Sequence, residues 1–137
     1  MILLDTSVLV AIVDQRDPQR PKALKDLTQL ARRGLLLSWP VLTEALHFLV
    51  RPDYRDYLAH FIDDFQIRFA DEQVRPATAD IFHWLARYAD HAPDMTDAYL
   101  VAMTAMNRRW KVWTFDREFH FVWRRPDGSP VPMAVKM

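Results

Sequence analysis

Short apolar runs alternate along this chain with longer amphipathic segments. The runs at residues 2–4, 35–38, 67–69 and 111–115 are short and rich in Leu, Ile, Val and aromatic residues, which is typical of strands buried on both faces of a parallel sheet. Between these runs, apolar residues recur at the spacing of a helix. The order of strand, helices and strand predicts an α/β fold whose parallel strands are joined by right-handed crossovers.

Prolines and glycine mark where several of the predicted helices begin and end. Pro40 and Pro52 suit the first turn of a helix, and Gly34 suits the position just after one. Helices are therefore expected over residues 8–13, 21–33, 40–50, 52–65, 76–88 and 96–107. A last strand is expected over residues 131–135, where Pro132 would place it at a sheet edge. The sheet should thus contain four to five strands.

The composition narrows the classes of function. The 137 residues match the usual size of one domain, so residues 1–137 are expected to form a single domain. The absence of cysteine excludes disulfides, thiolate zinc sites and cysteine nucleophiles. Only two glycines are present, which argues against a glycine-rich phosphate loop. The net charge is zero, so a role in binding nucleic acid would depend on local patches.

The N-terminal segment is predicted to be a strand and not a signal peptide. It has no basic region, and its apolar run meets an acid at Asp5. No apolar run approaches the roughly 20 residues that a helix needs to cross a bilayer. We therefore expect no membrane partner and, because a chain without cysteine suits a reducing compartment, a cytoplasmic location.

Four acidic residues lie where apolar runs end or helices begin. They are Asp5, Glu44, Asp97 and Asp116. In an open α/β sheet these positions meet at the edge where ligands bind. Carboxylates that are brought together there would repel one another unless a hard cation joined them. The sequence therefore predicts a site for Mg²⁺ or Mn²⁺, which prefer oxygen ligands in octahedral geometry.

The residues around these acids resemble the motifs of PIN-domain ribonucleases. The matching segments, in the family's order, are Asp5-Thr6-Ser7, Pro40-Val41-Leu42-Thr43-Glu44, Asp97-Ala98 and Thr114-Phe115-Asp116-Arg117-Glu118-Phe119. The last is a Thr-x-Asp-x-x-Phe pattern, and the resemblance runs from residue 1 to about residue 121. At this length the chain most resembles the VapC-type toxins of toxin–antitoxin pairs. The resemblance implies a three-layer α/β/α sandwich around a mostly parallel sheet.

The resemblance also implies a role for each acid. Asp5 and Asp97 would bind the metal ion directly, and Asp116 would bind it directly or through water. Glu44 would support these ligands, bind a second ion or position a water molecule. The hydroxyls nearby would hydrogen-bond the acids, orient a water molecule or cap the following helix, and they belong to Thr6, Ser7 and Thr114. No organic cofactor is implied.

Members of this family cleave RNA, with structured RNA such as transfer RNA as a common target. The implied function is thus a metal-dependent endoribonuclease that hydrolyses phosphodiester bonds. Such proteins often form homodimers. The implied partner is a small antitoxin protein that blocks the site, often by placing a basic side chain among the acids.

Each acid also has a simpler structural explanation. Asp5 could cap the first helix, and Asp94 could cap the helix in which Asp97 favours the positive N-terminus. Asp94 could also be an additional metal ligand. Asp116 could form a surface ion pair with Arg117, which would contribute little to stability.

Two other functions remain open at the level of sequence. The first is a non-catalytic module of the same fold that binds RNA or protein without cutting. The second is a phosphohydrolase that uses Asp5 as nucleophile, as enzymes of the haloacid dehalogenase type do. Those enzymes usually have a second Asp two residues later, where this chain has Ser7.

Basic and aromatic residues offer weaker signals. A basic cluster near the last motif could contact phosphates or form a solvated face, and it consists of Arg108, Arg109, Lys111, Arg117, Arg124 and Arg125. His120 follows the same motif and could approach RNA. The five tryptophans are expected in the core or at a dimer interface and not as platforms for stacked bases.

Overall fold

The computed structural model describes residues 1–137 and contains a four-stranded parallel sheet. Its strands are β1 (Ile2–Leu4), β2 (Leu35–Leu37), β3 (Arg68–Phe69) and β4 (Lys111–Trp113), and they lie in the order β3-β2-β1-β4. All three pairings are parallel. The predicted α/β class is therefore confirmed.

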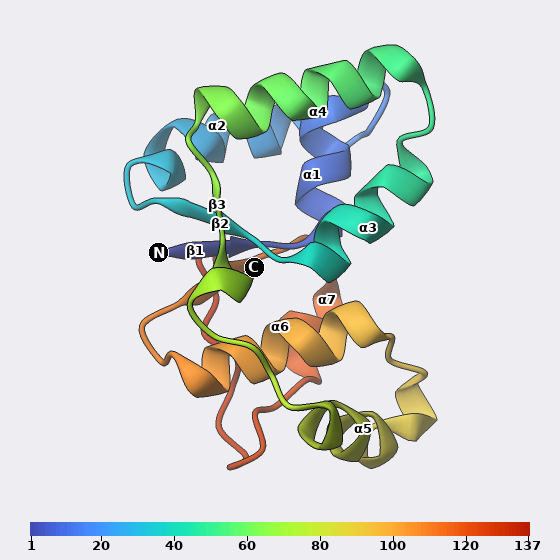
Figure 1. Cartoon of the computed structure of the whole chain (residues 1–137), viewed down its shortest axis with the longest axis vertical. Coiled ribbons are helices and arrows are strands. Elements are labelled where there is room, and N and C mark those ends of the chain that lie inside the picture. Colours follow the sequence, from blue (N-terminus) through green and yellow to red (C-terminus); the bar gives the residue numbers. More distant parts are fainter.

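Helices cover both faces of the sheet and complete a three-layer sandwich. They are α1 (Thr6–Val13), α2 (Arg20–Ala31), α3 (Trp39–Phe48), α4 (Pro52–Asp64), α5 (Thr78–Arg87), α6 (Met95–Met106) and α7 (Arg117–Phe121), with 3-10 turns η1 (Ala70–Glu72) and η2 (Ala89–His91). Figure 1 shows α1, α2 and α4 on one side of the sheet and α5 and α6 on the other. β1 and β2 are buried along their whole length, because the helical layers exclude water from both faces.

The pairing of β1 with β4 brings the first acidic motif, after β1, next to the last acidic motif, after β4. Ile2 pairs with Lys111 and Leu4 pairs with Trp113. The backbone N–H of Asp5 then donates to the carbonyl of Trp113 at 3.0 Å. Asp5 and the residues after Trp113 consequently leave the sheet side by side at its carboxyl edge.

Three details differ from the sequence-based predictions. Residues 131–135 form no strand; Met133 makes one isolated parallel bridge to Val112, beside the edge strand β4. Pro132 has no N–H to extend the pairing, and only its carbonyl accepts a bond from the N–H of Val112. Helix α1 already begins at Thr6, so Thr6 and Ser7 are helical and do not cap it. The short helix α7 was not predicted.

The core is one continuous cluster of 35 buried hydrophobic residues. Four of the five tryptophans belong to it, namely Trp84, Trp110, Trp113 and Trp123. The fifth, Trp39, is 55% exposed at the start of α3, so it lies outside the core, and the alternative of a dimer interface stays a prediction for this residue. No helix of the structure is both long and apolar enough to span a membrane.

Candidate functional site

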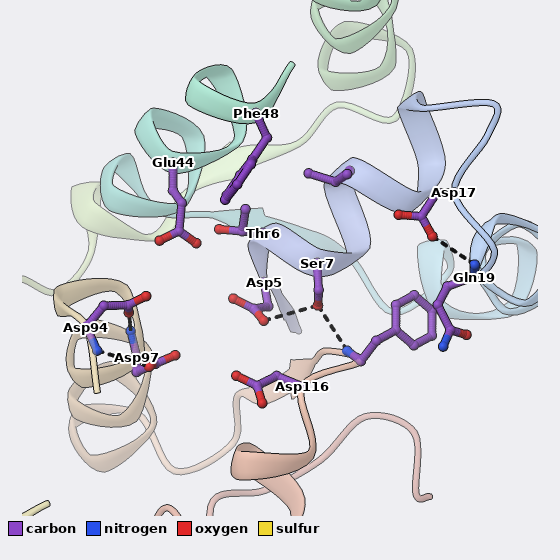
Figure 2. Close-up of a pocket in the computed structure, with 12 residues that line it drawn as sticks. Asp5, Thr6, Ser7, Asp17, Gln19, Glu44, Phe48, Asp94, Asp97 and Asp116 are labelled. Atoms are coloured by element: carbon purple, nitrogen blue, oxygen red, sulfur yellow. Dashed lines mark hydrogen bonds between the residues drawn. The ribbon is translucent and has the colours of Figure 1, made fainter. Parts of the chain in front are cut away.

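A cavity of about 400 Å³ opens at the carboxyl edge of the sheet. All four acids that the sequence singled out line it: Asp5, Glu44, Asp97 and Asp116. Figure 2 shows their carboxylates arranged around one open space. Asp17 and Asp94 also line the cavity, but no lysine, arginine or histidine does. The cavity therefore concentrates negative charge with no basic side chain in its wall.

Asp5 is the most deeply buried of these acids. It is 5% exposed, and one of its oxygens, Oδ2, accepts hydrogen bonds from Thr114 Oγ1 at 2.6 Å and from Ser7 Oγ at 3.2 Å. Asp5 occupies the N-cap position of α1, yet its side chain makes no capping hydrogen bond. Capping therefore does not explain this carboxylate. Burial is the main reason that its pKa rises to about 6, although the two hydroxyl bonds act in the opposite direction.

Ser7 and Thr114 connect the first motif to the last. The Thr114 hydroxyl oxygen accepts a bond from the N–H of Asp116 at 2.9 Å. Ser7 Oγ accepts one from the N–H of Phe115 at 3.0 Å. The Thr114 hydroxyl thus makes both contacts: it donates to the Asp5 carboxylate and accepts from the backbone N–H of Asp116. The Thr6 hydroxyl differs, since it is buried at the cavity without a hydrogen-bond partner.

Asp94 and Asp97 form a reciprocal capping box at the start of α6. Asp94 Oδ1 accepts from the N–H of Asp97 at 2.8 Å, and Asp97 Oδ2 accepts from the N–H of Asp94 at 3.2 Å. The predicted capping role of Asp94 is confirmed. The pKa of Asp97 rises to about 8, first because of burial and then because of the charges of Asp94, Asp5 and Asp116.

Glu44 and Asp116 reach the cavity from helices on either side of it. Glu44 lies on α3, and its Oε2 accepts a bond from Thr96 Oγ1 at 3.3 Å. Asp116 is the N-cap of α7, where its Oδ1 accepts from the N–H of Glu118 at 2.9 Å. Asp116 forms no ion pair with Arg117; the Arg117 guanidinium lies instead over the ring of Phe121, 5.2 Å from its centroid.

The predicted basic cluster does not reach the cavity. Arg125 is buried and donates to Ser129 Oγ and to the carbonyl of Thr104, so it holds the C-terminal loop in place. Arg108 pairs with Asp127 at 3.2 Å. His120 Nε2 lies 3.4 Å from the carbonyl of Thr114. Of the residues near the last motif, these three are therefore committed to contacts within the chain.

The donor chemistry of the cavity fits a hard divalent cation. Its ionisable groups are all carboxylates, and Mg²⁺ and Mn²⁺ prefer oxygen ligands. As the side chains stand, no three acidic or histidine residues converge closely enough to hold an ion. Burial first, and then the charges of Asp94, Asp5 and Asp116, raise the pKa of Asp97. A cation among these carboxylates would offset the part that is due to repulsion.

The fold and the cavity together define a parallel α/β protein with a carboxylate site at the sheet edge. The PIN domain family profile matches residues 2–122. The chain belongs to the PIN-domain family. This is a family of nucleases that generally use divalent metal ions.

Two solved structures share the fold. Mycobacterium tuberculosis VapC20, described as a Sarcin-Ricin loop cleaving toxin, is 21% identical with a TM-score of 0.65, over 86% of this chain and 92% of that one. PAE2754 from Pyrobaculum aerophilum is 18% identical with a TM-score of 0.54, over 85% of this chain and 75% of that one. No protein of curated function matches the sequence.

Several residues that line the cavity were not identified as site residues from the sequence, namely Val10, Asp17, Gln19 and Phe48. Asp17 lies between α1 and α2, and its Oδ1 accepts from the N–H of Gln19 at 2.8 Å. Phe48 follows Glu44 by one helical turn and points toward the cavity (Figure 2). The spacing of Phe48 from Glu44 on a predicted helix is a signal that could have identified it.

The raised pKa values predict how stability depends on pH in the metal-free protein. Asp97 has a pKa of about 8 in the folded state, compared with its ordinary value of 3.8. Between these two pH values the folded state therefore binds more protons than the unfolded state. The contribution of Asp97 to the free energy of unfolding must therefore decrease as pH rises from about 4 to about 8. We expect the Tm of the wild type, relative to Asp97→Asn, to fall across this range in EDTA. A constant difference in Tm would contradict the prediction.

The Asp5–Thr114 hydrogen bond predicts a second effect on stability. Thr114→Val keeps the shape but removes the hydroxyl that serves Asp5 and the N–H of Asp116. We expect a loss of roughly 1–3 kcal/mol, because buried groups lose their partner. Urea unfolding measures it, with Thr28→Val, at an exposed position on α2, as the control. Equal losses in the two variants would show that the bond contributes nothing.

Proposed function

We propose that this protein is a metal-dependent endoribonuclease that hydrolyses phosphodiester bonds of structured RNA. The observation that supports this most directly is the cavity at the sheet edge, where four motif acids from separate segments meet without a basic side chain. Membership of the PIN-domain family supports nuclease chemistry at the same place. The proposal treats residues 1–137 as one catalytic domain.

Three of the acids would bind the metal ion, and the fourth would position the attacking water molecule. Asp5, Asp97 and Asp116 would be its ligands, and Glu44, held by Thr96, would position the attacking water. Mg²⁺ or Mn²⁺, when bound, supplies Lewis-acid stabilisation of the phosphate and lowers the pKa of water. Thr114 keeps Asp5 and Asp116 at a fixed separation through the two bonds described above.

The likeness to VapC20 supports a more specific role as a toxin. That protein is described as a toxin that cleaves the Sarcin-Ricin loop, which is RNA. By analogy, this chain would act on structured RNA in the cytoplasm, with transfer RNA as a target class. A cognate antitoxin protein would block the acidic cavity, and the active form would be a homodimer.

The proposal predicts that RNA cleavage requires both the ion and the acids. Asp5→Asn and Asp116→Asn should each lower the rate of cleavage of a structured RNA in Mn²⁺ by roughly 100-fold or more, since even the partners of metal ligands are worth about 10–100-fold. Asp80→Asn, at an exposed position on α5 outside the cavity, is the matched control. EDTA should abolish cleavage by the wild type.

Calorimetry with Mn²⁺ separates this function from its main alternative. A non-catalytic module of the same fold need not bind the ion, whereas the nuclease must bind it and lose affinity in Asp97→Asn. Cleavage that persists in both Asp5→Asn and Asp116→Asn would overturn the assignment. So would a wild-type protein that binds neither Mn²⁺ nor Mg²⁺.

A further inference from the structure

An apolar groove of about 610 Å³ adjoins the acidic cavity. Its walls are formed by α3 and the start of α6, and they include the exposed side chains of Trp39, Phe48 and Met95. Glu44 and Phe48 line both the groove and the cavity. The two spaces therefore adjoin at these side chains, and Figure 2 shows Phe48 beside Glu44.

Trp39 is exposed but firmly held. Its backbone N–H donates to Asp71 Oδ1 at 3.1 Å, and the other oxygen of Asp71 accepts the Tyr99 hydroxyl. Its indole stacks on Phe69 with the ring centroids 4.2 Å apart and the planes 14° from parallel. An aromatic side chain that is already ordered loses little conformational entropy when a ligand stacks on it.

We propose that this groove seats an unstacked nucleobase of the RNA strand whose phosphate lies at the acidic cavity. The inference rests on the proposed function and names a substrate contact for the same site. A phosphate at Asp5 and Asp116 leaves its neighbouring nucleoside at the rim of the cavity, and the rim on the side of α3 is aromatic. Single-stranded nucleic acids are held by aromatic side chains on which their bases stack.

The chemistry of the groove favours a base over the phosphate backbone or a charged peptide. No lysine or arginine lines it, so it offers no permanent positive charge to a phosphate. Thr43 and His47 provide polar atoms at its wall, which suit the edge of a base. Its volume falls within the roughly 300–1,000 Å³ of pockets that hold small organic groups. A segment of a protein partner is the rival occupant, and the experiments below distinguish the two.

Steady-state cleavage of a stem–loop RNA tests the contact. Trp39→Ala and Phe48→Ala should each raise KM roughly 10- to 100-fold, the scale of losing one stacked base. kcat should change little, because stacking acts equally on the bound substrate and the transition state. Phe82→Ala is the matched control, since Phe82 is 66% exposed on α5 and lines neither space. Thermal melting of each variant checks that it is folded.

Fluorescence provides a readout that does not depend on cleavage. Trp39 is the only tryptophan that is more than 3% exposed, so a base that stacks there should quench its emission alone. Titration of Asp116→Asn with a single-stranded oligoadenylate keeps the RNA intact. We expect saturable quenching in Asp116→Asn, and no quenching in the double variant that also carries Trp39→Phe. An oligomer of abasic residues should not quench.

The outcomes separate this inference from the proposed function. If the wild type cleaves RNA and both groove variants retain its KM, the base subsite is wrong, the nuclease stands, and a protein segment becomes the occupant to consider. If the wild type cleaves no RNA, the proposed function fails, and quenching of Trp39 by oligoadenylate alone decides the groove. Absence of that quenching overturns the inference in either case.

Discussion

The site depends on the buried carboxylate of Asp5 and on the hydroxyl of Thr114 that donates to it. These residues lie 109 positions apart, and their oxygens are 2.6 Å apart. That distance follows from the parallel register of β1 and β4, which places Leu4 beside Trp113. A shift of one residue in this register would turn the side chains to opposite faces of the sheet. The sheet pairing and the geometry of the acids are therefore one constraint.

The acids of the cavity oppose the stability of the fold that presents them. Burial and mutual repulsion raise the pKa of Asp97 to about 8 and contribute to that of Asp5. A protein under selection for stability alone would replace such groups with apolar or neutral side chains. The capping box at α6 and the hydroxyls of Ser7 and Thr114 compensate only in part. The remaining repulsion is what a bound cation would offset.

The sequence predicts those features that depend on local pattern. The buried strands follow from short apolar runs, α3 and α4 from Pro40 and Pro52, and the grouping of the four motif acids from their order at strand ends and helix starts. The remaining features depend on tertiary context. Asp17 lies in the loop between α1 and α2, and only the tertiary fold brings it to the cavity. α7 is too short to show helical periodicity. Residues 131–135 look like a strand, yet their N–H and carbonyl groups pair with Val112 at one bridge only.

Trp39 shows how two contacts can hold an exposed aromatic side chain in a defined position. The sequence predicts the tryptophans in the core or at a dimer interface, and contacts with Asp71 and Phe69 hold Trp39 at the surface. The same two contacts anchor the first turn of α3. Glu44 and Phe48 lie one turn apart further along that helix and so share a face. One helix, positioned at its N-terminus by Asp71, thus orients both the carboxylate at the cavity and the aromatic wall beside it. In the proposed function, this shared helix would couple recognition of a base to the placement of a phosphate.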